Sequence, residues 1–158
     1  MTVEFTEGHI DFINDMLAKQ DMEHKEQFAT LMGRFEDGRL IVDDCELWSS
    51  KDLNQTEVSV TPISDSHWDK IGFNMNAKNC DFIITLHTHP EWFGTNRTGL
   101  DLSDQTAFKH WTRNFEDFGK ICINGIVTRS DSILLTYYSR EDDKFVDVSY
   151  EMRDFKRK

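Results

Sequence analysis

Cysteines are few in this sequence, and their placement argues against disulfide and thiol chemistry. Three occur in 158 residues, at Cys45, Cys80 and Cys122, and no two of them form a Cys-x-x-Cys pair. A stabilising disulfide framework is therefore not expected. Cys122 lies within an apolar run, where a buried, unreactive thiol is the usual state.

Long apolar runs and positive charge are also scarce. No run approaches the roughly 20 residues that span a bilayer, and the first residues lack the pattern of a signal peptide, so we expect a cytoplasmic protein. The chain has 18 Lys and Arg against 29 Asp and Glu, a formal net charge of -11 and a pI near 4.9. Because acidic surfaces repel phosphate backbones, nucleic acid is an unsuitable partner, whereas a basic or mixed-charge protein is suitable.

The hydrophobic content, 38% with 12% aromatic residues, is enough to build a core. Neither repeats nor a linker occur, so residues 1–158 are expected to form one domain. Apolar spacing and turn residues predict helices over about 6–20, 65–79 and 102–118. They predict strands over 26–35, 40–48, 58–63, 82–89, 120–129, 132–139 and 145–152, with a loop at 51–57. This order predicts an α/β or α+β fold, in which helices flank a mixed central sheet.

Two histidines end the most apolar of these strands. His87 and His89 are two residues apart, so they project from the same face of the strand, and Pro90 then ends it. Two neighbouring imidazoles can share one metal ion. Two ordinary polar residues at a strand end would give the same pattern.

A hydrolytic zinc site needs a third protein ligand. Asp101 and Asp104 both lie at the start of the helix that follows the histidine strand, from which either could reach the strand end. Either could equally cap that helix or interact with its dipole.

Two separated motifs together resemble the JAMM (MPN-plus) zinc isopeptidases. Residues 87–90, His-Thr-His-Pro, and 98–101, Thr-Gly-Leu-Asp, are similar to the family signature His-x-His-Pro…Ser-x-x-Asp. Residues 26–33 resemble the family's early strand, in which a glutamate precedes a glycine by seven positions. The resemblance spans about Thr6 to Arg129.

The match departs from the family pattern at several positions. Thr98 replaces the usual serine, and the loop before it is one residue longer than the commonest spacing, which keeps Asp104 as a second choice for Asp101. Ala29 stands where a glycine is usual, and Leu86 where an aromatic residue often precedes the first histidine.

The resemblance implies a fold of the MPN (JAB) type with cytidine-deaminase-like layering, and one zinc ion held by His87, His89 and Asp101. A water on that ion would have its pKa lowered to roughly 7. Glu26 would take the proton of this water and pass it to the leaving amine, and Thr98 would donate a hydrogen bond to the oxyanion.

The implied reaction is hydrolysis of the amide bond after the C-terminus of a ubiquitin-like protein, in deconjugation or maturation. Trp92 and Phe93 would line the channel for that extended tail, or else anchor the loop in the core. Small members of this kind occur beside ubiquitin-like conjugation enzymes in bacterial antiphage operons, which makes such a role an expectation by analogy.

Three alternatives remain at this point. The first is an inactive scaffold of the same fold that binds protein partners, and the second is an amidase for small molecules or short peptides. The third is a cysteine peptidase, for which Cys122 has no histidine nearby in the sequence.

Overall fold

One large sheet organises the protein, seen here in a computed structural model that describes residues 1–62, 65–90, 100–129 and 132–153. The described helices are α1 (Glu7–Glu23), α2 (Asp65–Ala77) and α3 (Leu102–Asp117), with a 3₁₀ turn, η1 (Ser50–Asp52). The described strands are β1 (Thr2–Phe5), β2 (Phe28–Glu36), β3 (Arg39–Leu47), β4 (Leu53–Gln55), β5 (Val60–Pro62), β6 (Phe82–Thr88), β7 (Ile121–Arg129), β8 (Ser132–Ser139), β9 (Lys144–Asp147) and β10 (Ser149–Met152).

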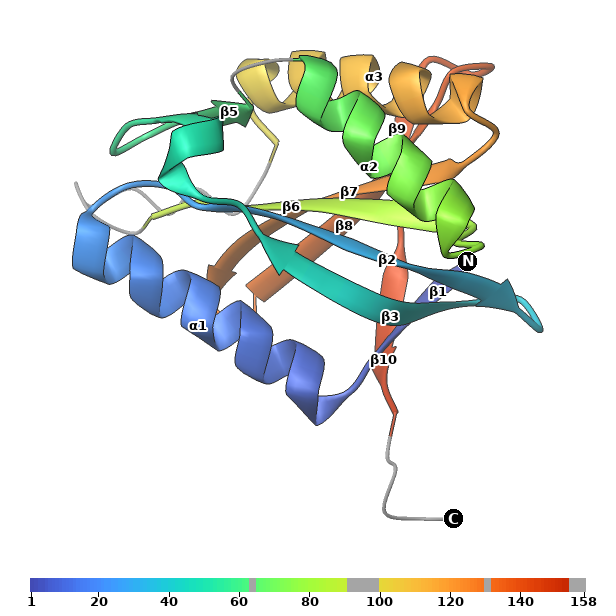
Figure 1. The fold of residues 1–158 in the computed structure, drawn as a ribbon, viewed down its shortest axis with the longest axis horizontal. Helices are drawn as coiled ribbons and strands as arrows, with labels where there is room; N and C mark the ends of the chain where they lie inside the picture. The colour runs from blue at the N-terminus through green and yellow to red at the C-terminus, as the bar shows by residue number, and fades with distance from the viewer. Residues whose placement is uncertain (63–64, 91–99, 130–131, 154–158) are drawn as a thin grey trace.

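Eight of these strands form the sheet, in the order β10-β1-β3-β2-β6-β7-β8-β9. β9 and β10 lie at its two ends, although only Val148 separates them in sequence. β9 pairs antiparallel with β8, and β10 pairs parallel with β1. The chain thus changes pairing partner at Val148 and joins the two ends of the sheet, which curves the sheet into a near-barrel (Figure 1).

Helices cover both faces of this sheet. α1 lies on one face, and α2 and α3 lie together on the other, as Figure 1 shows. Two cores result. The α1 core includes Phe5, Ile13, Met16 and Leu31, and the α2–α3 core is rich in aromatic side chains: Phe28, Trp48, Trp68, Phe108, Trp111 and Phe115. The coarse prediction of a mixed α/β or α+β architecture is confirmed.

Three local predictions were wrong. β1 was missed because its four residues pair only with distant segments, in parallel with β3 and β10. The expected loop at 51–57 contains η1 and β4, which pairs with β5 in a small second sheet. The single strand expected at 145–152 is two strands, β9 and β10.

Candidate metal centre

The pairing of β2 with β6 brings the predicted glutamate to the two histidines. Phe28 lies opposite His87 in this antiparallel register, and continuing the register by two residues places Glu26 opposite His89. Because side chains two apart share a face, Glu26, His87 and His89 all face the α2–α3 side of the sheet. Residues 61 positions apart in the chain therefore meet at one end of the sheet.

Backbone contacts hold this end of the sheet in place. The Gln27 N–H donates to Thr88 Oγ1 at 2.8 Å, and the Thr88 N–H donates back to the Gln27 carbonyl at 3.0 Å. The Glu26 N–H donates to the Thr56 carbonyl at 3.0 Å, and its own carbonyl accepts from Gln55 Nε2 at 2.7 Å. The segment around β4 and β5 thus fixes the backbone of Glu26.

The start of α3 supplies two carboxylates with different roles. Asp101 is the N-cap: its Oδ1 accepts from the Asp104 N–H at 2.8 Å, and Asp104 Oδ2 accepts in return from the Asp101 N–H at 3.3 Å. This reciprocal arrangement satisfies two N–H groups at the helix start. It also directs Asp104, which is buried, toward the sheet, while Asp101 stays partly exposed.

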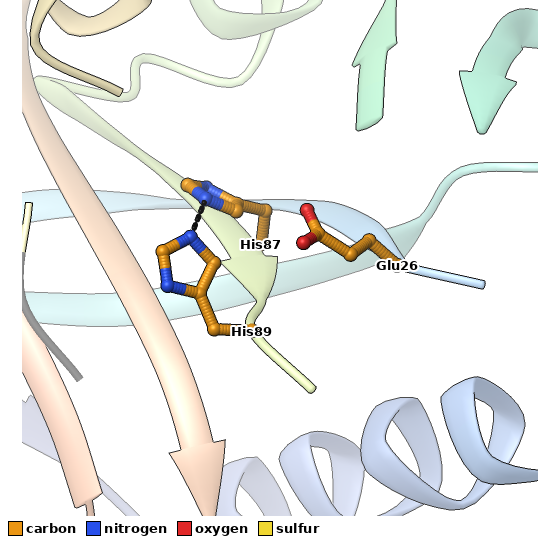
Figure 2. A group of neighbouring side chains, drawn as sticks. All are labelled: Glu26, His87 and His89. Carbon is orange, nitrogen blue, oxygen red and sulfur yellow. Dashed lines mark hydrogen bonds between the residues drawn. The ribbon is translucent and has the colours of Figure 1, made fainter. Parts of the chain in front are cut away.

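The two imidazoles and the Asp104 carboxylate form a tight group. The Nε2 atoms of His87 and His89 lie 3.0 Å apart. Asp104 Oδ1 lies 3.1 Å from His87 Nε2, and its Oδ2 lies 3.2 Å from His89 Nε2. The Glu26 carboxylate points toward the imidazoles from the segment that leads into β2, as Figure 2 shows, and one of its oxygens lies within 4.8 Å of a nitrogen of each. All four side chains are buried.

These separations are close to those of zinc ligands. Ligands at about 2.0–2.1 Å from a tetrahedral zinc ion are separated from one another by about 3.3–3.4 Å. The two nitrogens are 3.0 Å apart, and each nitrogen lies 3.1 or 3.2 Å from a different oxygen of Asp104, so the separations are slightly smaller. Two imidazoles and a carboxylate are also a common ligand set of catalytic zinc, which leaves a fourth position open. The residues therefore fit the ion that the sequence resemblance implies.

Protonation alone does not account for the same three contacts. A neutral imidazole carries one proton, on either Nδ1 or Nε2. If both Nε2 atoms are protonated, each can donate to Asp104, but the contact between the nitrogens then has no acceptor. If one Nε2 is unprotonated, its lone pair faces a carboxylate oxygen. A shared cation would satisfy all three contacts.

Charge at the site is set by burial and by the hydrogen bonds. Burial lowers the pKa of His87, and the hydrogen bond to Asp104 opposes this only partly. Burial by itself would raise the pKa of Asp104, but hydrogen bonds from His87 and His89 outweigh it and hold that pKa well below its usual range. An ionised carboxylate beside a neutral His87 is the protonation state that metal binding requires.

His87 lacks one feature of many metal-binding histidines. Such a ring usually donates its other N–H to a carboxylate or carbonyl, but His87 Nδ1 is buried with no hydrogen-bond partner among the described residues. The Phe108 ring packs edge-on against His87, with ring centroids 5.7 Å apart. Packing by α3, rather than a hydrogen bond to Nδ1, thus holds the ring on this side.

Some of the expected site residues lie together in the structure, and others lie outside the described residues. Glu26, His87 and His89 come together, and Asp104 rather than Asp101 contacts both imidazoles. Asp101 does lie in a second group with His89 and Asp104, but it caps α3 through Oδ1. The printed contacts with both imidazoles come from Asp104, and which of the two aspartates would bind a metal ion stays a prediction. Thr98, Trp92 and Phe93 fall in residues 91–99, outside the described residues.

The cysteine alternative has no support in the described structure. Cys122 lies in β7 and is fully buried, and burial raises the pKa of its thiol to about 12. Its sulfur lies 3.7 Å from Asn124 Oδ1, to which the thiol donates. A protonated, inaccessible thiol is not a nucleophile.

Comparisons with known proteins extend the description of the fold only. No protein-family model matches the chain, and no curated protein matches it either. Among solved structures, it is similar to the protein DSY2949 from Desulfitobacterium hafniense, at 11% sequence identity and a TM-score of 0.61, over 97% of this chain and 94% of that one. Within the described residues, none of the helices has the length and apolar character needed to cross a membrane.

Proposed function

We propose that the chain is a zinc-dependent peptidase of the JAMM (MPN-plus) type. In this proposal it hydrolyses the amide bond that follows the C-terminus of a ubiquitin-like protein. The observation that carries the proposal is the convergence of Glu26, just before β2, and of His87 and His89, at the end of β6, with Asp104 from α3. The order of motifs in the sequence adds support, because the same residues stand where the family has its glutamate and its paired histidines.

Each residue has a distinct role in this chemistry. His87, His89 and Asp104 would hold the ion. Bound zinc would supply Lewis acidity, which polarises a substrate carbonyl and makes a water molecule more acidic. Glu26 would accept the water proton on its carboxylate and deliver it to the leaving amine. The burial of the group limits competing water around these charges.

Glu26 is suited to the base role for a structural reason. Its backbone is fixed on both sides, by Thr56 and Gln55, so that the carboxylate is held near the imidazoles before substrate binds. Positioning of this kind removes an entropic cost that the reaction would otherwise include. Asp104 makes two direct contacts with the imidazoles, which is suited to a ligand rather than to a base.

The test is cleavage of two matched substrates by zinc-loaded protein. One is ubiquitin joined through its C-terminus to a lysine side chain of a peptide, and the other is the C-terminal tetrapeptide of ubiquitin as a fluorogenic amide. We expect cleavage of the isopeptide conjugate, and we expect a chelator to abolish it. Cleavage of the tetrapeptide alone would favour an amidase, and cleavage of neither would favour a non-catalytic scaffold.

Glu26→Gln is the control variant. It keeps the size and the polarity of the side chain but removes the base, so we expect the zinc affinity to stay within about threefold while activity falls by roughly 10²–10⁴. Unchanged activity in this variant would remove Glu26 from the mechanism.

A further inference from the structure

A buried series of hydrogen-bonded side chains, called here the polar chain, connects the sheet to α3 outside the metal centre. Thr85 Oγ1 of β6 donates to Asn124 Oδ1 of β7 at 2.6 Å, and Asn124 Nδ2 donates to Thr112 Oγ1 of α3 at 3.1 Å. All three side chains are fully buried. Since an unpaired buried polar group costs more than its hydrogen bond returns, this chain fixes the distance between the sheet and the helix.

The same chain lies in register with the metal centre. Thr85 and Asn124 are paired across β6 and β7, and Thr85 shares a sheet face with His87 and His89. From Thr85 to His89 is four strand residues, or about 13 Å. From Thr112 back to Asp104 is eight helical residues, or about 12 Å. The two spans are similar in length. The polar chain therefore joins β6 to α3 at one end, and the contacts of Asp104 with the imidazoles join them at the other.

The remaining contacts of α3 constrain its axial position less. Phe108, Trp111 and Phe115 bury the inner face of the helix in the aromatic core, and apolar contacts have no preferred direction. Its other directional contacts are partly exposed: Tyr137 donates to Glu116 at 3.1 Å in the last turn, and Lys109 and Arg140 form ion pairs with Asp143 and Glu116, each at 3.5 Å. The Asn124–Thr112 hydrogen bond is directional and buried, and it lies nearer to Asp104.

We infer that Asn124 and Thr112 are positioning residues, which set the place of Asp104 over the two imidazoles. The inference rests on the metal site of the proposed function. Metal–ligand distances are satisfied only within about 0.2 Å, so a small displacement of α3 along its axis is enough to weaken the third ligand. Neither residue touches the ion or the substrate, and both act through the helix.

The sheet offers a matched control at Thr30. This threonine of β2 is paired with Thr85 and is fully buried. Its Oγ1 accepts from Trp48 Nε1 at 3.1 Å, the length of the Asn124–Thr112 bond. Thr30→Val and Thr112→Val therefore each remove a fully buried hydroxyl that accepts one hydrogen bond, but only Thr112→Val removes a hydrogen bond between the sheet and α3.

The experiment measures the zinc dissociation constant by chelator competition, together with the visible spectrum of the cobalt-substituted protein. Thr112→Val is expected to weaken zinc binding about tenfold or more, in the range for residues that orient metal ligands, and to change the cobalt spectrum. Thr112→Ser keeps the hydroxyl and Thr30→Val keeps the tie to α3, so both are expected within about threefold of the parent protein. Urea unfolding of each variant compares the losses of stability.

Two results would overturn the inference, and they are distinguishable. If Thr112→Val binds zinc as tightly as Thr30→Val at an equal loss of stability, the hydrogen bond is only structural and the proposed function is unaffected. If the parent protein itself binds no zinc, the metal site and the proposed function fail together with the inference.

Discussion

Asp104→Asn tests which of two neighbouring aspartates would bind the metal ion of the proposed site. The substitution keeps the size of the side chain and removes the charge that lies 3.1 Å and 3.2 Å from the two imidazoles. Removing one partner from a buried charged contact costs about 3–5 kcal/mol, which corresponds to a weakening of zinc binding by roughly 10²–10⁴.

Asp101→Asn is the matched comparison. Asparagine caps helices about as well as aspartate, so α3 should begin at the same residue and keep Asp104 in place. We expect the zinc dissociation constant of this variant to stay within about threefold of the parent value.

The assay is competition with a chromophoric chelator at pH 7, with far-ultraviolet circular dichroism to establish that both variants keep their helices. A large loss of zinc affinity in Asp101→Asn together with a small loss in Asp104→Asn would refute the geometric assignment. It would restore the ligand set that the motif spacing implies.

Three further predictions concern the thiol, the helix cap and the close packing of the sheet. Because burial raises the pKa of Cys122 to about 12, iodoacetamide at pH 8 should leave this thiol unmodified in the native protein, and mass spectrometry that finds it alkylated would contradict its burial. Burial lowers the pKa of His9 in the folded protein, and the charge of Asp43 opposes this only partly. As the pH falls, the unfolded chain therefore binds a proton at His9 before the folded protein does, and the free energy of unfolding decreases below about pH 6.5. His9→Gln keeps the capping pattern, so urea titrations should show a smaller loss of stability between pH 6.5 and 5 than in the parent, and an equal loss would exclude His9 as a contributor. Gly33→Ala places a Cβ 1.8 Å from a backbone oxygen of β3, whereas the close contacts of a Cβ at Gly125 are the ends of two leucine side chains, at 2.7 Å and 2.9 Å. Overpacking costs about 1–3 kcal/mol, so thermal unfolding should show the larger loss of stability for Gly33→Ala, and the reverse order would contradict the close approach of β2 to β3.

Local signals were sufficient for most elements of the fold. The Thr6 capping position and the apolar spacing that follows predict a helix at 6–20, and α1 spans Glu7–Glu23. The Asp37-Gly38 turn was predictable because both residues adopt positive φ, 51° and 79°. The apolar run before His87 predicted β6, which is buried along its whole length.

Pairing between distant segments was not predictable from local signals. β1 is only four residues long and is held in the sheet by parallel pairing with β3 on one side and β10 on the other. The strand predicted at 145–152 has a continuous pattern, but its halves pair with opposite ends of the sheet on either side of Val148. Only the closure of the sheet determines that division, and closure is a property of the whole chain.

The candidate site was predictable to the level of residue type and approximate place. The two histidines follow from strand periodicity, and Glu26 followed from the family resemblance. The choice between Asp101 and Asp104 depends on which residue caps α3, since the cap turns the other carboxylate toward the sheet. Both residues are acceptable caps in sequence, so the pattern alone left this choice open. The support from Asn124 and Thr112 was missed, because their contact joins a strand to a helix over sequence positions with no shared motif.

In the proposed site, one cation would be held between the end of β6 and the start of α3, with Glu26 beside it. Anomalous diffraction at the zinc absorption edge, from crystals grown with zinc, tests it directly. We expect one strong site about 2.0–2.1 Å from His87 Nε2, His89 Nε2 and an oxygen of Asp104, with the Glu26 carboxylate close to the open position. Zinc bound elsewhere, or no anomalous density between the two imidazoles, would contradict it.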